Sequence, residues 1–391
     1  MTTQERARLL FDEYDRYRVA AVGPLTCKHG VVEKLLRKVV EQGGKRLILE
    51  EMGRSLEGRS INLIRCGKGR SSALLWSQMH GDEPTATLAL LDIFTYLATS
   101  TDAWVEKLLE SVAIYALPMM NPDGAERPQR ETSVWVDMNR DARVQATPEA
   151  LLLRKAQLEL QPEFAFNLHD QELCSAGTAP RATALALLAP PADEQRSMGP
   201  VRRKAVQVSA MIVASLKQFA DGHLATYDDT HEPRAFGDGM QSWGTSTVLI
   251  EAGHWVGDRT KAFVRKLNGI AILAALASIA DRSYMKADES LYHTLPVNGK
   301  RMFDVIIRNI WLLHPDGWKH VADIGCTAEP ANNRGTLDRP SRSMVVTVKE
   351  IGDLSTHGAL ETVEGFGRAI ETSALSIGAV MPLGALLDCC R

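Results

Sequence analysis

The sequence predicts an α/β protein in which helices flank a mixed central sheet, followed by a small β-rich C-terminal domain. Between residues 46 and 285, short apolar runs of strand length alternate with longer segments of helical character. This alternation is typical of an α/β sandwich. Beyond residue 290, strand-like runs are separated by Gly, Pro and Asn. We therefore expect a helical N-terminal cap, a central α/β domain and a β-rich domain, at residues 1–45, 46–285 and 290–391.

Each expected strand of the central domain is a short, mainly apolar run. These runs are residues 61–65, 73–76, 112–117, 164–168 and 247–250. Segments of helical character are residues 85–99, 148–160, 202–219 and 260–280. In the C-terminal domain, residues 302–307 and 344–348 are the clearest strands. Because folds of this class place binding and catalytic residues in the loops at strand ends, the polar residues that follow these strands are the functional candidates.

Composition excludes several classes of function. The chain has 391 residues, 45% of them hydrophobic, and a net charge of −3 without a basic stripe, so we expect no nucleic-acid partner. The six cysteines include no CxxC pair, which argues against a thiolate zinc site or a disulfide framework; only Cys389 and Cys390 are adjacent. The N-terminus resembles no secretory signal, and the apolar run at 270–277 is too short to span a membrane. We expect a cytoplasmic protein with no membrane partner.

The most informative segment is His80-Gly81-Asp82-Glu83, which follows the strand at 73–76 and precedes a helix that begins near Pro84. A His and a Glu three residues apart at a strand end can turn toward one point. Imidazole nitrogen and carboxylate oxygen both bind zinc. With one distant third ligand, this pair would leave a coordination position open, as in a catalytic zinc site.

Further polar residues occur at corresponding places along the chain. His169 follows the strand at 164–168, and Glu251 follows the strand at 247–250. A polar region after the strand at 112–117 contains two arginines, an aspartate and an Asn-Arg pair: Arg127, Arg130, Asp137, Asn139 and Arg140. Taken singly, each has a plain explanation, since a lone His-x-x-Glu arises by chance, a loop arginine is usually solvated, and an Asp often caps a helix. Together, they indicate a metal-dependent active site.

This set of motifs, in this order over about residues 45–280, resembles the zinc carboxypeptidases of the pancreatic carboxypeptidase superfamily. The resemblance implies one zinc ion per chain with three ligands, His80, Glu83 and His169. It implies that Glu251 is the general base and that Asn139 and Arg140 bind the terminal carboxylate of the substrate. It also implies that Arg130, or failing that Arg127, polarises the scissile carbonyl. Asp137 would orient a zinc-bound imidazole without binding the zinc itself.

The chain also departs from that pattern. Asp82 stands where pancreatic members have a basic residue that contacts the substrate. The loop at 234–243, where those members bring a mobile tyrosine over the substrate, holds no tyrosine, and Tyr227 is the nearest candidate. The β-rich tail lies beyond the minimal family domain. It could cover the cleft, mediate association or only add stability.

Three functions follow as alternatives. The first is a metallocarboxypeptidase that hydrolyses an amide next to a free carboxylate and releases a C-terminal amino acid. The second is an N-acyl amino acid deacylase or a cell-wall peptide amidase on the same zinc scaffold. All of these substrates, whether peptide or N-acyl amino acid, present a carboxylate near the scissile amide, so the Asn-Arg pair does not separate them. The third is a binding module without catalysis, which the complete ligand and base set argues against. The sequence does not predict an oligomeric state.

Overall fold

The computed structural model describes residues 1–328 and 344–388, so Cys389 and Cys390 lie outside the described residues. The chain divides into two compact units. Unit 1 comprises Met1–Gln171, Leu185–Ala252 and Phe263–Val297, and unit 2 comprises Glu172–Ala184, Gly253–Ala262 and Asn298–Arg391. The helical segments expected at 1–45 belong to the same unit as the central sheet. The domain boundaries expected from the sequence stay a prediction.

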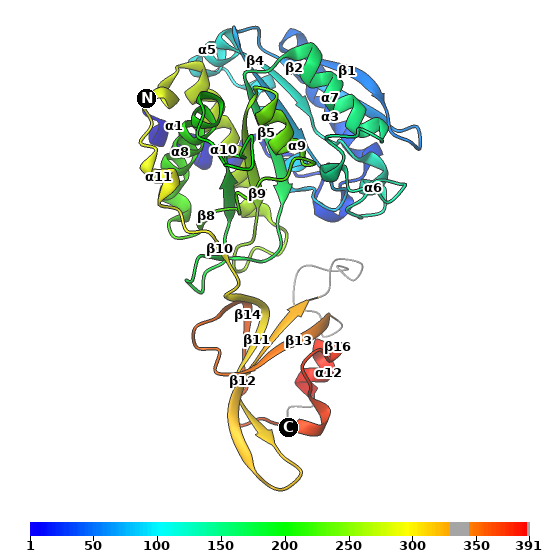
Figure 1. The fold of residues 1–391 in the computed structure, drawn as a ribbon, viewed down its shortest axis with the longest axis vertical. Helices are drawn as coiled ribbons and strands as arrows, with labels where there is room; N and C mark the ends of the chain where they lie inside the picture. Colours follow the sequence, from blue (N-terminus) through cyan, green and yellow to red (C-terminus); the bar gives the residue numbers. More distant parts are fainter. Residues whose placement is uncertain (329–343, 389–391) are drawn as a thin grey trace. The chain divides into compact units, whose positions relative to one another are not determined.

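Unit 1 is built on an eight-stranded mixed sheet, as predicted, with the strand order β1-β2-β4-β3-β5-β9-β7-β8 (Figure 1). The strands β4, β3, β5 and β9 pair in parallel, whereas β1, β2 and β7 join the sheet by antiparallel pairing. The bounds are β1 Leu47–Arg54, β2 Ser60–Cys66, β3 Ser71–Ser77, β4 Val112–Leu117, β5 Phe164–Asp170, β7 Leu185–Leu188, β8 Leu224–Thr226 and β9 Ser246–Ala252.

Helices cover this sheet and follow the predicted segments closely. The longer ones are α3 His29–Gly43, α4 Thr85–Thr99, α5 Ala103–Ser111, α7 Pro148–Leu160, α8 Pro200–Ala220 and α10 Ala262–Ala280. The shorter ones are α1 Thr3–Asp12, α2 Tyr14–Tyr17, α6 Pro122–Glu126, α9 Phe236–Ser242 and α11 Ser290–His293. On one face of the sheet, α7 and α9 pack over apolar strand residues such as Leu74 and Trp76. This core fixes the strand ends that carry the polar candidates.

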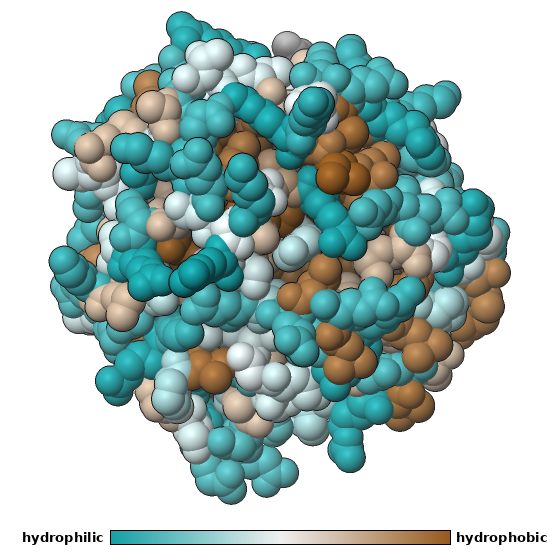
Figure 2. Space-filling model, turned by 90° about the horizontal axis from the view of Figure 1, so that it is seen from above, coloured by the Kyte–Doolittle hydropathy of each residue, from teal (hydrophilic) through white to brown (hydrophobic). Residues whose placement is uncertain are grey.

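Helix α10 contains the apolar run at 270–277. It is the one helix among the described residues that is long and apolar enough to cross a membrane, yet 83% of its 18-residue apolar window is buried inside the protein. A core helix of a globular protein has the same properties. On the face drawn in Figure 2, hydrophilic side chains predominate and apolar residues appear in separate groups between them, which is ordinary for a protein surface.

Unit 2 contains the predicted β-rich C-terminal region. Its sheet has the order β14-β11-β12-β13-β16, and β15 pairs with β11. The bounds are β11 Met302–Leu313, β12 Lys319–Ala328, β13 Val345–Gly352, β14 Gly358–Glu364, β15 Ala369–Glu371 and β16 Val380–Pro382, followed by α12 Leu383–Asp388. A two-residue strand within the unit, β6 Ser175–Ala176, pairs with β10 Asn298–Gly299. Buried side chains such as Ile307 and Ile324 give this unit a core of its own.

Within unit 1, a buried ion pair holds the residues before α3 against α4 and α10. Asp92 on α4 and Arg265 on α10 are both almost fully buried, and the Nε of Arg265 donates to Asp92 Oδ2 at 2.7 Å. The hydroxyl of Tyr14 donates to the same carboxylate at 2.5 Å, and the backbone N–H of Val19 donates to it at 2.7 Å. Arg265 also donates to the carbonyl of Val19 at 3.0 Å. One buried carboxylate therefore joins α4, α10 and the chain before α3.

Replacing this carboxylate tests how much the network stabilises the fold. We expect Asp92→Asn to lower the free energy of unfolding by about 3–5 kcal/mol, because it leaves the charge of Arg265 buried without a counterion. The matched control is Glu33→Gln, which removes the partly exposed Glu33–Arg37 pair on α3 and should cost less than about 0.5 kcal/mol. Urea unfolding of both variants measures the difference. Equal losses would contradict a stabilising role for the buried network.

Candidate active site

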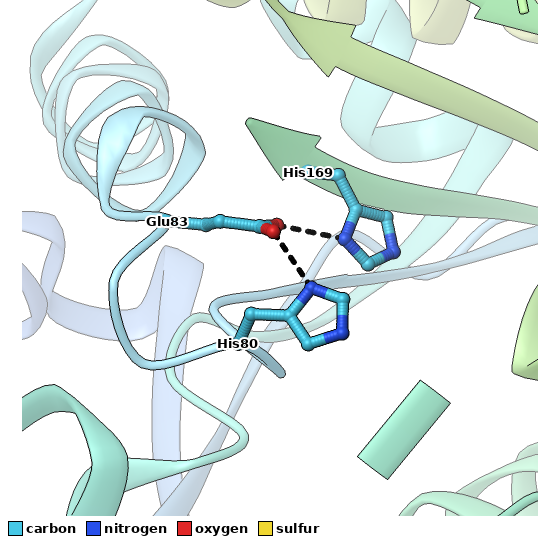
Figure 3. A group of neighbouring side chains, drawn as sticks. All are labelled: His80, Glu83 and His169. Carbon is cyan, nitrogen blue, oxygen red and sulfur yellow. Dashed lines mark hydrogen bonds and ion pairs between the residues drawn. The ribbon is translucent and has the colours of Figure 1, made fainter. Parts of the chain in front are cut away.

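The centre of the site is a carboxylate placed between two imidazole rings. His80 Nδ1 lies 2.7 Å from Glu83 Oε1, and His169 Nδ1 lies 2.8 Å from Glu83 Oε2. Figure 3 shows both rings directed at the carboxylate. One potential ligand atom from each residue falls within 4.8 Å of the others, and all three residues are buried. The structure thus brings together the three residues that the sequence predicts as metal ligands.

Strand pairing explains why residues so far apart in the sequence meet here. The strands β3 and β5 are parallel neighbours, with Ser77 opposite Leu168, so both reach the same edge of the sheet. His80 and Glu83 lie in the loop after β3, directly before α4, and His169 is the penultimate residue of β5. Parallel strands place their carboxyl ends together, and this edge is where α/β folds bind ligands.

The loop that carries His80 and Glu83 is held by close contacts. Gln78 has a positive φ of 51°, an uncommon conformation for this residue type. Its amide nitrogen donates to the carbonyl of Gly81 at 3.0 Å, and the hydroxyl of Thr87 donates to its amide oxygen at 2.9 Å. Gly81 packs so tightly that a Cβ there would lie 2.0 Å from the carbonyl carbon of Gly124. Only glycine fits, and the loop is therefore fixed against α6, the short helix that follows β4.

Burial and the neighbouring charges shift the pKa of each of the three residues. Burial lowers the pKa of His169, which favours the neutral imidazole that binds metals. Burial also lowers the pKa of His80, but Glu83 and Asp137, at its two ring nitrogens, raise it to about 9. Although burial opposes ionisation of Glu83, the two imidazoles hold its pKa well below the usual value. A buried anionic carboxylate between two imidazoles is a donor set that zinc accepts.

Asp137 and Arg130 support this group from one side. Asp137 Oδ1 lies 3.0 Å from His80 Nε2, the ring nitrogen that faces away from Glu83. Such a contact fixes the orientation of a ligating ring. The guanidinium of Arg130 donates to Glu83 Oε1 at 3.2 Å and to Asp137 Oδ2 at 3.2 Å. Burial raises the pKa of Asp137, but its bonds to His80 and Arg130 hold that pKa well below the ordinary value.

The two candidate arginines are separated by the structure. Arg130 contacts Glu83 and Asp137, with its side chain 43% exposed. Arg127, in contrast, donates to the Glu57 carboxylate at 2.5 Å and to the carbonyl of Asp123 at 3.2 Å. Neither of these two contacts is with a residue of the His80–Glu83–His169 group. Of the two, Arg130 is therefore the one beside the candidate metal ligands.

Glu251 lies next to the metal group through strand pairing. In the parallel pair β5–β9, Glu251 is the register partner of His169. Burial, and after it the negative charge of Glu83, raises the pKa of Glu251 well above its usual value. A divalent cation held by the three ligands would oppose the effect of Glu83 and favour the carboxylate form of Glu251. This is the form that a general base requires.

The Asn-Arg pair contacts the start of α9 through Asn139. Both residues belong to the short 3-10 helix Met138–Arg140. Asn139 Oδ1 accepts from the backbone N–H of Phe236, the first residue of α9, at 3.0 Å, so its amide N–H₂ is the group that can donate to a ligand. Arg140 is half-exposed, and its Nε lies 3.6 Å from Glu232 Oε2. That distance is long for a charge-assisted hydrogen bond.

Sequence reasoning missed other residues that shape the site. The backbone N–H of Asp170 donates to Glu83 Oε2 at 3.1 Å, and the Thr85 hydroxyl donates to the Asp170 carboxylate at 2.5 Å. Asp170 directly follows His169 in the sequence, and this position was the available signal. Burial, and after it the negative charge of Glu83, raises the pKa of Asp82. Tyr227 is 41% exposed at the end of β8, and its part in the site stays a prediction.

Comparison with known proteins identifies the family. The sequence profile of the zinc carboxypeptidase family matches residues 32–241, more than half of the chain. The chain belongs to the zinc carboxypeptidase family. Zinc is the metal of this family, and His80, Glu83 and His169 are the residues of this chain that would hold it. The match includes the three metal candidates and the Asn-Arg pair but ends before Glu251, whose assignment rests on its register with His169.

Individual known proteins are similar to parts of this chain in sequence or in fold. Mouse carboxypeptidase M is 30% identical over 108 residues, which cover 25% of this chain and 24% of that protein. The chain spans between 8% and 33% of the length of the curated relatives with which it is compared. A metallo-carboxypeptidase from Burkholderia cenocepacia is similar in fold, with a TM-score of 0.51 and 17% identity over 64% of this chain and 68% of that one. Thrombin-activatable fibrinolysis inhibitor gives a TM-score of 0.55 and 13% identity over 66% and 75%.

The contact between Asp137 and His80 predicts an effect on metal affinity. We expect Asp137→Asn to weaken zinc binding about 10- to 100-fold, because a neutral amide holds the imidazole less firmly than a carboxylate does. Competition with a coloured chelator gives the dissociation constant. The control is Glu57→Gln, which removes a carboxylate paired with Arg127 instead. An affinity of Asp137→Asn equal to that of this control would show that Asp137 does not support the metal site.

Proposed function

We propose that this protein is a zinc-dependent carboxypeptidase that hydrolyses the last amide bond of a peptide and releases the C-terminal amino acid. The observation that carries the proposal is the meeting of buried His80, Glu83 and His169 beside Glu251. A buried cluster of ionisable side chains at the ends of parallel strands needs a functional reason, since desolvating these groups is costly. Zinc-dependent hydrolysis of an amide bond supplies that reason.

The chemistry divides between the metal and the residues around it. Zinc, when bound, supplies Lewis acidity that activates water and polarises a carbonyl. The carboxylate of Glu251 accepts a proton from the attacking water and then passes it to the nitrogen of the leaving amine.

Arg130 has the position to stabilise charge on the scissile carbonyl oxygen. Its guanidinium is anchored by Glu83 and Asp137, so its donors are oriented before a substrate binds. Its partial exposure keeps it accessible to a ligand. A preorganised cation of this kind stabilises a developing oxyanion most strongly where water is excluded.

Asn139 and Arg140 together form the carboxylate clamp. The guanidinium of Arg140 offers a planar fork that matches a carboxylate. Glu232, which lies 3.6 Å from it, is itself bound more closely by Arg234 at 2.5 Å. A substrate carboxylate can therefore take the place of Glu232 at Arg140 without leaving Glu232 unpaired. This favours substrates with a free carboxylate next to the scissile amide.

The clamp alone does not separate peptides from N-acyl amino acids or cell-wall peptides. Peptides are supported by two of the relatives that share sequence with this chain, mouse carboxypeptidase M and the probable carboxypeptidase 2 of Trichophyton verrucosum. A panel that includes all three substrate classes, each with its C-terminal amide as a control, distinguishes them. Faster turnover of N-acyl amino acids than of peptides would favour a deacylase. Turnover of the C-terminal amides at an equal rate would argue against the clamp.

Metal removal and loss of the base test the mechanism. We expect chelation to abolish hydrolysis and added zinc to restore it. Glu251→Gln should bind zinc in the same 1:1 ratio as the native protein but lose about 10²–10⁴-fold in kcat, since an amide cannot accept the proton. Zinc content and peptide hydrolysis are measured on the same samples. Activity that survives chelation, or a fully active Glu251→Gln, would contradict the proposal.

The two arginines make a matched pair for testing carbonyl polarisation. We expect Arg130→Ala to lower kcat/KM about 10²–10³-fold, the range found when one oxyanion donor is lost. Arg127→Ala removes the same side chain a few residues away, where it contacts Glu57 instead, and should change kcat/KM less than about twofold. Steady-state kinetics on one peptide substrate measures both. Equal effects of the two variants would assign no special role to Arg130.

A further inference from the structure

A cavity lies in unit 1, apart from the candidate metal ligands. It has a volume of about 530 Å³, and its lining residues lie on or next to α1, α5 and the end of α10. One of them is Ser111, the residue directly before β4. Strand β4 has six residues and runs parallel to β3, whereas the metal group lies at the carboxyl ends of β3 and β5. The cavity is therefore near the opposite end of the strands, about 20 Å from the metal group.

A buried arginine lines this cavity. Arg6 on α1 is only 9% exposed, and its Nε is buried with no hydrogen-bond partner among the described residues. Its ion pair with Asp281 spans 3.7 Å from Nη2 to Oδ2, which is too long for a hydrogen bond, and the Asp281 side chain is 50% exposed. Buried charges in proteins are normally paired and hydrogen-bonded. The guanidinium of Arg6 therefore lacks the acceptor that its burial calls for.

Most of the surface that lines the cavity is apolar. Trp104 lies beside Arg6, with the centroid of its ring 5.2 Å from the guanidinium carbon. The smaller apolar residues of the lining are Ala103, Leu108, Ala277 and Ala280. Pockets that bind small molecules combine such a lining with a few polar groups, and their volumes are about 300–1,000 Å³. This cavity has both properties.

The other charged side chains of the lining favour a ligand with a single negative charge. They are Lys107, Glu110 and Asp281, and all three residues are exposed. Water and salt screen these exposed charges, whereas the charge of buried Arg6 is screened less. A monoanion can therefore pair with Arg6. A dianion such as phosphate would be repelled by Glu110 and Asp281.

We propose that this cavity binds a small monocarboxylate with an apolar body, and that the carboxylate pairs with Arg6. This binding site is separate from the proposed catalytic site and does not depend on the proposed function. A guanidinium can donate two parallel hydrogen bonds to a carboxylate. The apolar body buries surface against the alanines and Leu108, which contributes affinity that a smaller anion lacks.

Three probes test the charge and the apolar body separately: hexanoate, neutral hexanamide and acetate. They are titrated by calorimetry into the zinc-loaded full chain carrying Arg140→Ala, so that the proposed carboxylate clamp does not contribute. We expect hexanamide to bind about 10- to 100-fold more weakly than hexanoate, because it has no charge to pair with Arg6. Acetate should bind at least about tenfold more weakly, because it lacks most of the apolar body.

Variants of the lining locate the binding. In the same Arg140→Ala chain, Arg6→Gln should weaken hexanoate binding about 10- to 100-fold. The matched control is Arg8→Gln, which removes an exposed arginine of the same helix and should change the affinity less than about twofold. Ala280→Phe keeps Arg6 but occupies part of the cavity, and it should also weaken binding at least about tenfold. Urea unfolding shows whether each variant is folded.

Several results would overturn the inference. One is the absence of saturable hexanoate binding at millimolar concentration, and another is equal affinity for hexanoate and hexanamide. A third is an equal effect of Arg6→Gln and Arg8→Gln, or an unchanged affinity in a folded Ala280→Phe variant. Tighter binding of inorganic phosphate than of hexanoate would contradict the monocarboxylate class. If Arg6→Gln does not fold, Ala280→Phe and the comparison of the three probes still decide.

Discussion

The site depends on the charge of one buried carboxylate. Glu83 accepts from both imidazoles, from the backbone N–H of Asp170 and from the guanidinium of Arg130. An isolated carboxylate at this depth would take up a proton, because burial penalises its charge. The four donors keep it ionised and draw the ends of β3 and β5 to the same point. Its partners are thus positioned by electrostatics as much as by packing.

The same carboxylate couples residues that are usually discussed separately. Arg130 bridges Glu83 and Asp137, and Asp137 in turn contacts His80. A substitution at any one of them alters the surroundings of the others. Effects of such residues do not add, because each change removes interactions that its neighbours share. Binding of the metal, orientation of the imidazole and orientation of Arg130 are therefore facets of one hydrogen-bonded network.

The sequence was sufficient for the parts of the fold that apolar patterning specifies. The buried strands β3, β4, β5 and β9 and the helices α4 and α7 lie where continuous apolar runs and helical segments predict them. Edge strand β1 was missed because its apolar run, Leu47-Ile48-Leu49, is short and is followed by exposed charges at Glu50 and Glu51. The three-residue strand β8 is too short to leave a pattern.

The site shows the same division between what is local and what is not. His80 and Glu83 could be read from spacing, and His169 and Glu251 from their places at strand ends. The choice between Arg127 and Arg130 could not, because it depends on which way a polar loop turns. The contribution of Asp170 was also hidden, since it acts through its backbone N–H. A contact made by a backbone atom cannot be predicted from the type of residue at that position.

The contact between Gly81 and Gly124 defines the smallest transplantable form of this active site. Because the backbones at Gly81 and Gly124 approach closely, the four residues from His80 to Glu83 cannot be transferred alone. A protein engineer who moves them into a new scaffold must bring the segment after β4 as well, and must keep glycine at position 81. The unit to transfer therefore consists of the loop after β3 and the segment after β4, which also carries Arg130 and Asp137.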